Sequence, residues 1–220
     1  MPEETFSIAL PNGTAVTAVR SRPDGKTSAL VAYAPGAGSN VHDPFGRFLS
    51  RRLAGEGIST VRLQFPYMEA RKRGPDPPAL LEATWRTAIA ALRGDAARLI
   101  VGGRSMGGRI ASQVVAAGEA VDGLALFAYP LHPPGQPDRL RDAHLPRIAV
   151  PALFCSGTRD AFASPDELRA AASKVARATI HLLNVADHGF AAPKASGRTR
   201  EEIWSEAAEA LIEWFDESVL

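Results

Sequence analysis

Cysteine is almost absent from this sequence: Cys155 is the single one among 220 residues. One thiol cannot form an internal disulfide, so no disulfide framework supports the fold, and a reducing compartment is permitted. Cys155 lies in an apolar run, and we therefore expect a buried structural thiol. The chain begins Met-Pro-Glu-Glu, an acidic start without an apolar secretory segment, which leads us to expect a cytoplasmic protein.

An excess of charge of one sign is also lacking. The 25 Lys and Arg residues nearly balance the 24 Asp and Glu residues, and the formal net charge is +1. Such a balance gives no electrostatic footprint for nucleic acid. No apolar stretch approaches the ~18 residues that a membrane-spanning helix needs. We therefore expect neither a nucleic-acid partner nor membrane insertion.

What is present is an ordinary globular composition, with 45% hydrophobic and 22% charged residues. The length suits one domain over residues 1–220 with a single large core. The glycine-rich segments lack a G-K-[ST] ending, and no G-x-G-x-x-G opens a first βαβ unit, so nucleotide binding is not indicated. No cofactor and no metal are predicted.

The spacing of apolar residues predicts an α/β fold. Residues 5–10 and 14–20 flank Pro11-Asn12-Gly13, which predicts an N-terminal antiparallel hairpin. Further strands are predicted at 28–34, 59–65, 99–102, 123–129, 152–155 and 179–185. Helices are predicted at 43–55, about 81–92, 106–117, and from capping boxes at 164 and 199. This alternation implies a three-layer sandwich, with a mostly parallel sheet and helices on both faces.

Residues 103–107, Gly-Arg-Ser-Met-Gly, form the pattern G-x-S-x-G between a predicted strand and a predicted helix. This is the setting of a nucleophile elbow, in which the serine occupies a strained turn. Bulky residues two positions away would clash, which accounts for Gly103 and Gly107. The turn also places Ser105 at a helix N-terminus, where free N–H groups favour developing negative charge. Ser105 is therefore the predicted nucleophile, and the alternative is a tight turn without chemistry.

A serine nucleophile needs a base, and the base needs an orienting acid. In this topology the chain order is serine, acid, histidine, each in a loop after a strand. Asp160 follows the predicted strand at 152–155, and His188 follows the one at 179–185. We predict Asp160 as the acid and His188 as the base. Asp187, adjacent to the histidine, is the alternative acid.

The other four histidines are expected to have different roles. His181 lies inside a predicted strand as a packed or surface residue. His144 lies in a proline- and arginine-rich connection and is expected to be solvated. His132 precedes the acid, the wrong order for a base, so we expect it to be structural or to face the substrate. His42 precedes a helix and is expected to border the site.

The oxyanion hole should pair the Met106 N–H with an N–H from the glycine-rich loop 34–39. Pro35 has no N–H, so Gly36 or Ala37 is the expected donor, with Gly36 also beside the substrate. The alternative is a turn that only redirects the chain.

The segment 66–78 leaves the same sheet edge, and four prolines stiffen it. We predict that Tyr67 and Met68 wall an acyl pocket, and that Arg104 beside the nucleophile faces the substrate. One of the basic residues at 71–73 is expected to attract an anionic group. The alternative is that these three form a solvated turn.

Together these motifs resemble the α/β-hydrolase superfamily over nearly the whole chain. A closer resemblance is carried by F-P-Y-M at 65–68, G-G-R-S-M-G-G-R at 102–109, Y-P-L-H-P-P at 129–134 and G-T-R-D at 157–160. These segments are similar to those of a small, cap-less branch related to the dienelactone hydrolases. The resemblance implies a triad of Ser105, Asp160 and His188, with Ala37 as an oxyanion donor. Pro35 stands where the family often has histidine.

The predicted function is hydrolysis of a small or flexible carboxylic ester or thioester through an acyl-enzyme. About twenty residues, 131–150, join the strands at 123–129 and 152–155, which is too few for a helical cap. An open site without a cap favours small or flexible acyl groups. The alternatives are a peptidase or amidase with the same triad, and a non-catalytic binding or scaffold protein. The sequence does not indicate an oligomeric state.

Overall fold

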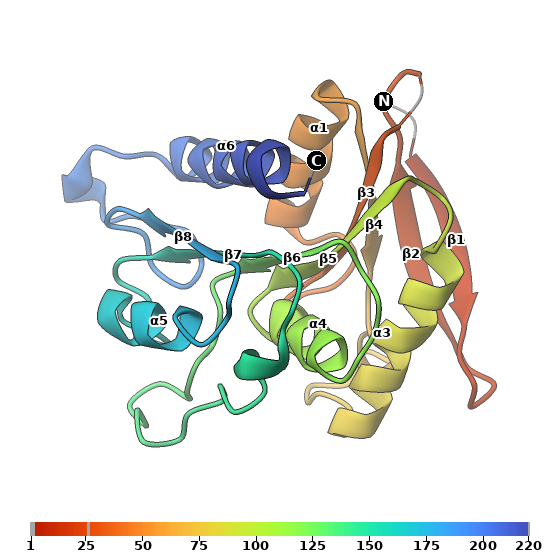
Figure 1. Ribbon diagram of the computed structural model, residues 1–220, viewed down its shortest axis with the longest axis horizontal. Helices are drawn as coiled ribbons and strands as arrows, with labels where there is room; N and C mark the ends of the chain where they lie inside the picture. The colour runs from red at the N-terminus through yellow and green to blue at the C-terminus, as the bar shows by residue number, and fades with distance from the viewer. Residues whose placement is uncertain (1–2, 26, 220) are drawn as a thin grey trace.

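A central sheet organises the computed structural model, which describes residues 3–25 and 27–219. Its strands are β1 (Glu3–Ala9), β2 (Ala15–Ser21), β3 (Ala29–Ala34), β4 (Ile58–Leu63), β5 (Arg98–Arg104), β6 (Gly123–Phe127), β7 (Ala152–Gly157) and β8 (Ala178–Leu183). Their order across the sheet is β1-β2-β4-β3-β5-β6-β7-β8 (Figure 1). β1 pairs antiparallel with β2, and β2 with β4, whereas the pairs from β4 to β8 are parallel. The predicted mostly parallel sheet with an N-terminal hairpin is confirmed.

Helices cover both faces of this sheet. They are α1 (Pro44–Gly55), α2 (Pro66–Glu69), α3 (Pro78–Leu92), α4 (Met106–Ala116), α5 (Pro165–Ala172) and α6 (Arg200–Ser218), with 3₁₀ helices η1 (Leu145–Arg147) and η2 (Lys194–Ser196). Figure 1 shows α1 and α6 on one face and α3, α4 and α5 on the other. The three-layer sandwich is confirmed.

Each face of the sheet has its own apolar cluster. Trp85 of α3, Ile110 of α4 and Leu168 of α5 are buried on one face. Phe45 of α1 and Leu211 of α6 are buried on the other. Removing this apolar surface from water is the main force that holds the helices on the sheet. The packing of α4 matters most for function, because Ser105 immediately precedes it.

Two helix starts follow the sequence signals closely. The Ser164 and Thr199 side chains accept hydrogen bonds from the backbone N–H of Glu167 and Glu202, and both capping boxes are complete. One start was not expected, since α2 begins at Pro66 inside the segment predicted as a loop. Proline suits the first helical position because its ring presets φ and the missing N–H has no intrahelical acceptor there.

The connection between β6 and β7 contains one element of regular structure, the 3₁₀ helix η1, and forms no cap. It does hold His144, and here the expectation of a solvated ring is wrong. His144 is buried, and its Nε2 lies 2.8 Å from Ser112 Oγ on α4 and 3.2 Å from Tyr129 Oη. The apolar neighbours Leu145 and Ile148 carry this connection onto α4 and bring the imidazole with it.

Over residues 3–25 and 27–219, no helix has both the length and the apolar character needed to cross a bilayer.

Candidate active site

The residues predicted to carry chemistry follow strands that end at one edge of the sheet. Ser105 directly follows β5, Asp160 follows β7, and His188 follows β8. In a parallel sheet the carboxyl ends of neighbouring strands lie together, and ligand sites form outside them. The topology therefore brings residues 83 positions apart in the chain into contact.

Ser105 occupies a turn that the surrounding backbone leaves little room to change. Its φ is 52° and its ψ is −118°, in the left-handed region that a serine rarely adopts. A Cβ on Gly103 would lie 2.0 Å from the Ala34 carbonyl oxygen, and one on Gly107 would lie 2.1 Å from the same atom. The two glycines of the G-x-S-x-G pattern thus let the turn rest directly on the end of β3.

Ser105, His188 and Asp160 form a continuous chain of hydrogen bonds. His188 Nε2 lies 2.9 Å from Ser105 Oγ, and His188 Nδ1 lies 2.9 Å and 2.8 Å from the two Asp160 carboxylate oxygens. The Asp160 side chain is 0% exposed and the His188 side chain 24% exposed. A buried carboxylate on Nδ1 favours the tautomer whose Nε2 can accept a proton from the serine.

Phe162 supports both the acid and the base, and the sequence analysis did not single it out. Its backbone N–H donates to Asp160 Oδ1 at 2.8 Å. Its ring stacks on the His188 imidazole, with 4.0 Å between centroids and 27° between planes. The only available signal was its position two residues after Asp160, which is typical of a turn closed by an aspartate side chain.

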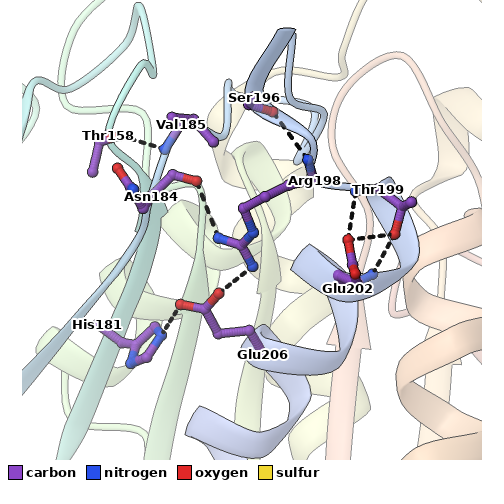
Figure 2. Close-up of polar contacts among 9 residues, drawn as sticks. All are labelled: Thr158, His181, Asn184, Val185, Ser196, Arg198, Thr199, Glu202 and Glu206. Carbon is purple, nitrogen blue, oxygen red and sulfur yellow. Dashed lines mark hydrogen bonds and ion pairs between the residues drawn. The ribbon is translucent and has the colours of Figure 1, made fainter. Parts of the chain in front are cut away.

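The loop that carries His188 joins β8 to α6 and is tied together at its base (Figure 2). The Arg198 guanidinium donates to the Asn184 carbonyl at 3.2 Å and forms an ion pair with Glu206 of α6. The other Glu206 oxygen lies 3.0 Å from His181 Nε2 on β8. This Arg198–Glu206–His181 network joins the two ends of the loop to the two elements that flank it.

The tip of the same loop is held by different contacts. Asp187 Oδ1 accepts hydrogen bonds from the backbone N–H groups of Gly189 at 2.8 Å and Ala191 at 2.9 Å. The Phe190 ring packs edge-on against Phe45 of α1, with centroids 5.2 Å apart. The Asp187 carboxylate therefore shapes the loop and forms no hydrogen bond with the histidine ring.

A family model described as an alpha/beta hydrolase domain matches residues 27–216. The chain belongs to this α/β-hydrolase family.

Solved structures share the fold of this hydrolase over nearly its whole length. An esterase domain from Rhodothermus marinus has a TM-score of 0.77 at 15% identity, covering 100% of both chains. Dienelactone hydrolase from Anabaena variabilis has a TM-score of 0.76 at 19% identity, covering 100% of this chain and 99% of its own. A serine hydrolase without a lid from Xanthomonas campestris has a TM-score of 0.70 at 16% identity, covering 97% and 96%. The predicted resemblance is confirmed, and it supports an esterase-like hydrolase.

A cleft of about 570 Å³ opens in front of Ser105 in this hydrolase. Four of the residues predicted to be beside the substrate or the oxyanion line it: Gly36, Ala37, Arg104 and Met106. Gly36 is close to the nucleophile, since a Cβ added there would lie 3.5 Å from Ser105 Cβ.

The structure does not bring the remaining predicted residues to this cleft. His42 is exposed outside the lining, and His132 is buried, with its ring hydrogen-bonded to the Pro133 carbonyl. Met68 of α2 is buried, and Tyr67 reaches the site indirectly, because its hydroxyl donates to the Ala37 carbonyl at 2.7 Å.

The basic residues at 71–73 also lie away from Ser105. They line a separate hollow of about 360 Å³, which shares residues 37–39 with the main cleft. The arginines of the main cleft are Arg104, Arg109 and Arg141, and the sequence analysis had assigned a role only to the first.

Within the described part of the hydrolase, the His, Cys, Asp and Glu side chains form no cluster of three that could hold a metal ion.

Proposed function

We propose that this α/β hydrolase cleaves a small or flexible carboxylic ester or thioester with Ser105 as nucleophile, His188 as base and Asp160 as orienting acid. The observation that carries the proposal is the contact of 2.9 Å between Ser105 Oγ and His188 Nε2, with the buried Asp160 carboxylate behind the ring. Family membership supports ester hydrolysis, and the hydrogen-bonded geometry supports the roles that we propose for the three residues.

In the first half-reaction, His188 Nε2 removes the proton of Ser105 Oγ while this oxygen attacks the carbonyl carbon of the substrate. The tetrahedral intermediate then collapses. The bond to the alcohol or thiol breaks, and His188 gives its proton to that leaving group. Asp160 keeps its negative charge and stabilises the imidazolium that forms between the two transfers.

In the second half-reaction, water replaces the leaving group. His188 removes a proton from the water as it attacks the acyl-enzyme, and then returns a proton to Ser105 Oγ as the acid is released. The cleft lies open to solvent because η1 is the one helical element between β6 and β7, so water reaches the ester bond directly.

The intermediate's oxyanion needs two N–H donors. We assign one to Met106, because the first amides of a helix have no intrahelical acceptor and the helix dipole favours negative charge there. We assign the other to Ala37. Gly36 packs against Ser105, and the Ala37 carbonyl accepts a hydrogen bond from the Tyr67 hydroxyl, which fixes the loop beside the nucleophile.

Labelling with a fluorophosphonate probe tests the proposal, because only an activated serine reacts. The intact protein is expected to be labelled. The Ser105→Ala variant is expected to remain unlabelled, while its circular dichroism spectrum shows that it is folded. A panel of 4-nitrophenyl esters, acyl-CoA thioesters and 4-nitroanilides then identifies the bond that is cleaved. Preference for anilides would favour the peptidase or amidase alternative. Absence of labelling and of all turnover would favour a non-catalytic binding protein.

A further inference from the structure

The cleft in front of Ser105 is lined by more cationic than anionic side chains. Three arginines line it, namely Arg104, Arg109 and Arg141, whereas Asp43 is the one carboxylate in the lining. The charge of the cleft is therefore positive, although the whole chain is close to neutral with a net charge of +1.

Asp43 and Arg104 compensate each other. The Asp43 carboxylate lies 3.5 Å from the Arg104 guanidinium and is itself buried. It also accepts hydrogen bonds from the Tyr33 hydroxyl at 2.6 Å and from the Gly46 backbone N–H at 2.9 Å. This pair adds no net charge to the cleft, and Arg104 already compensates the charge of the Asp43 carboxylate.

Arg109 and Arg141 form no ion pair with any carboxylate of the described residues. The Arg109 side chain makes one long polar contact, 3.4 Å from its Nη1 to Gln113 Oε1. Its buried Nε has no hydrogen-bond partner among the residues that the structure describes. Burial lowers the pKa of Arg109, and the nearby charge of Arg141 lowers it further. Both observations indicate two guanidinium groups that face the same space, with neither paired to a carboxylate of the described residues.

Both groups are fixed close to the nucleophile. The Arg109 N–H donates to the Ser105 carbonyl at 3.0 Å, so Arg109 lies one turn, or about 5.4 Å, further along the same helix face. The Arg141 N–H donates to the Leu131 carbonyl at 2.7 Å, which holds this residue beside the start of the connection that follows β6. The pair therefore borders the place where an ester bound to Ser105 would extend.

A guanidinium presents paired N–H groups that match a carboxylate or phosphate, and such charge-assisted hydrogen bonds are stronger than neutral ones. We propose that Arg109 and Arg141 form an anion-binding subsite, and that the substrate is an ester or thioester that carries a carboxylate or a phosphate beside its scissile bond. This inference rests on the proposed function and deepens it, because it defines the class of substrate.

The test compares two matched substrates in the intact protein: the mono-4-nitrophenyl ester of glutaric acid, which is anionic, and 4-nitrophenyl valerate, which has the same length and is neutral. The expected kcat/KM is at least ~10-fold higher for the glutarate ester. Arg109→Gln and Arg141→Gln are each expected to reduce this preference by roughly tenfold, the effect of losing one hydrogen bond to a charged group. The readout is the ratio of kcat/KM for the two substrates and not either rate alone.

Arg139→Gln is the matched control, because Arg139 is exposed two residues from Arg141 and lies outside the cleft lining. It should leave the preference unchanged. A second substrate pair locates the anion: butyryl-CoA, which has phosphates in its leaving group, against the neutral thioester butyryl-N-acetylcysteamine. If the arginine variants lose the preference within the glutarate pair, the anion is a carboxylate in the acyl part. If they lose the preference within the CoA pair, the anion is a phosphate in the leaving group.

Failure of this inference and failure of the proposed function give different results. Turnover that depends on Ser105 but is indifferent to charge in both pairs, with no effect of either arginine variant, would overturn the anion subsite alone. If no ester is cleaved, calorimetric titration with glutarate and with inorganic phosphate decides. Binding that is lost in Arg109→Gln and Arg141→Gln would support the subsite without the proposed chemistry, and no binding would overturn both.

Discussion

The nucleophile and the base of the proposed triad are held in place by different means. Around Ser105 the constraint is backbone against backbone, because Gly103 and Gly107 rest on the Ala34 carbonyl with no space for a methyl group. Around His188 the constraint is a set of side-chain contacts, from the Phe162 ring to the Arg198–Glu206–His181 network. An atom added to tightly packed backbone forces the chain to move, so one substitution there is expected to displace Ser105 strongly. Several side-chain contacts hold His188, so the loss of one contact is expected to displace it less.

Removing the proposed base is expected to cause the largest loss of activity among the variants compared. His188→Ala is expected to lower kcat/KM for a neutral ester by roughly 10⁴-fold or more, as for other members of a catalytic unit. His132→Ala is the matched histidine loss. Its ring hydrogen-bonds to the Pro133 carbonyl instead of Ser105, so we expect a reduction of less than ~10-fold. Steady-state kinetics of both variants decide, and the reverse order of effects would mean that another histidine is the base.

Gly107→Ala tests the backbone-packed side. The added Cβ would lie 2.1 Å from the Ala34 oxygen and 2.7 Å from the Pro35 oxygen, so the elbow or the end of β3 must move. We expect a loss of roughly 10²-fold in kcat/KM, since small displacements of catalytic groups are costly. We also expect about 1–3 kcal/mol less stability from overpacking.

Gly55→Ala is the control for that variant, because Gly55 lies in α1 with nothing within 4 Å of the added Cβ. It should keep full activity and gain up to about 1 kcal/mol from the better helix propensity of alanine. If Gly107→Ala were as active as Gly55→Ala, the close packing of the elbow would not be what positions Ser105.

Lowering the pH is expected to reduce the free energy of unfolding through the buried His144 imidazole, which hydrogen-bonds to α4, the helix that follows Ser105. Burial, then the charges of Arg109 and Arg147, lower the pKa of His144 to about 4 from the ordinary 6.5. The folded state thus favours the neutral ring. The stability that this provides is complete above pH 6.5 and is lost as the pH falls towards 4, with an upper limit of about 3 kcal/mol.

Urea unfolding at pH 7 and pH 5 measures this contribution. The parent protein should lose about 2 kcal/mol more than His144→Gln over that interval, because glutamine can still hydrogen-bond to Ser112 and does not titrate. Equal losses in the two proteins would show that His144 does not carry the pH dependence.

Arg198→Gln tests the side-chain network and should have the smallest effect. Arg198 and Glu206 are 26% and 31% exposed, so their ion pair is expected to contribute about 1 kcal/mol or less to stability. We expect kcat to fall about 2- to 5-fold with little change in KM, because the loop holds His188 less closely and the substrate cleft is untouched.

The neighbouring Arg200→Gln is the control, since Arg200 is exposed and outside the network. A rise in KM in Arg198→Gln at constant kcat would indicate a role in binding substrate instead of positioning the histidine. An unchanged kcat would show that the tip contacts of Asp187 and Phe190 are sufficient by themselves.

The same contrast explains how much could be predicted from the sequence. Strands, helices and capping boxes depend on local periodicity, and the structure confirms them. Ser105, Asp160 and His188 could be found because each follows a strand in a fixed order, and the structure brings them within hydrogen-bonding distance. Their chemical roles stay a proposal.

The side chains that surround them could not be found in this way. Arg109 belongs to the cleft because of the direction of one helical turn, and Arg141 because the irregular connection 131–150 folds back on the end of β6. The four-residue spacing from Ser105 to Arg109 is present in the sequence but no motif marks it, and the connection that carries Arg141 has no periodic signal. His144 lies in that same connection, and the charged residues that surround it along the chain gave no indication that it is buried together with Leu145 and Ile148.

The single cysteine has a practical consequence of its own. Cys155 is fully buried in β7, paired with Phe127 of β6 on one side and His181 of β8 on the other, and burial raises the pKa of its thiol. Its side chain is packed in the apolar cluster that α1 and α6 form on one face of the sheet, so a thiol reagent can modify the protein only while that cluster is open. Where the cluster closes again faster than the reagent reacts, the rate of modification gives the population of that open form. Because β7 leads to Asp160, the rate of thiol modification in the unaltered protein measures how often the part of the sheet that carries the proposed acid opens.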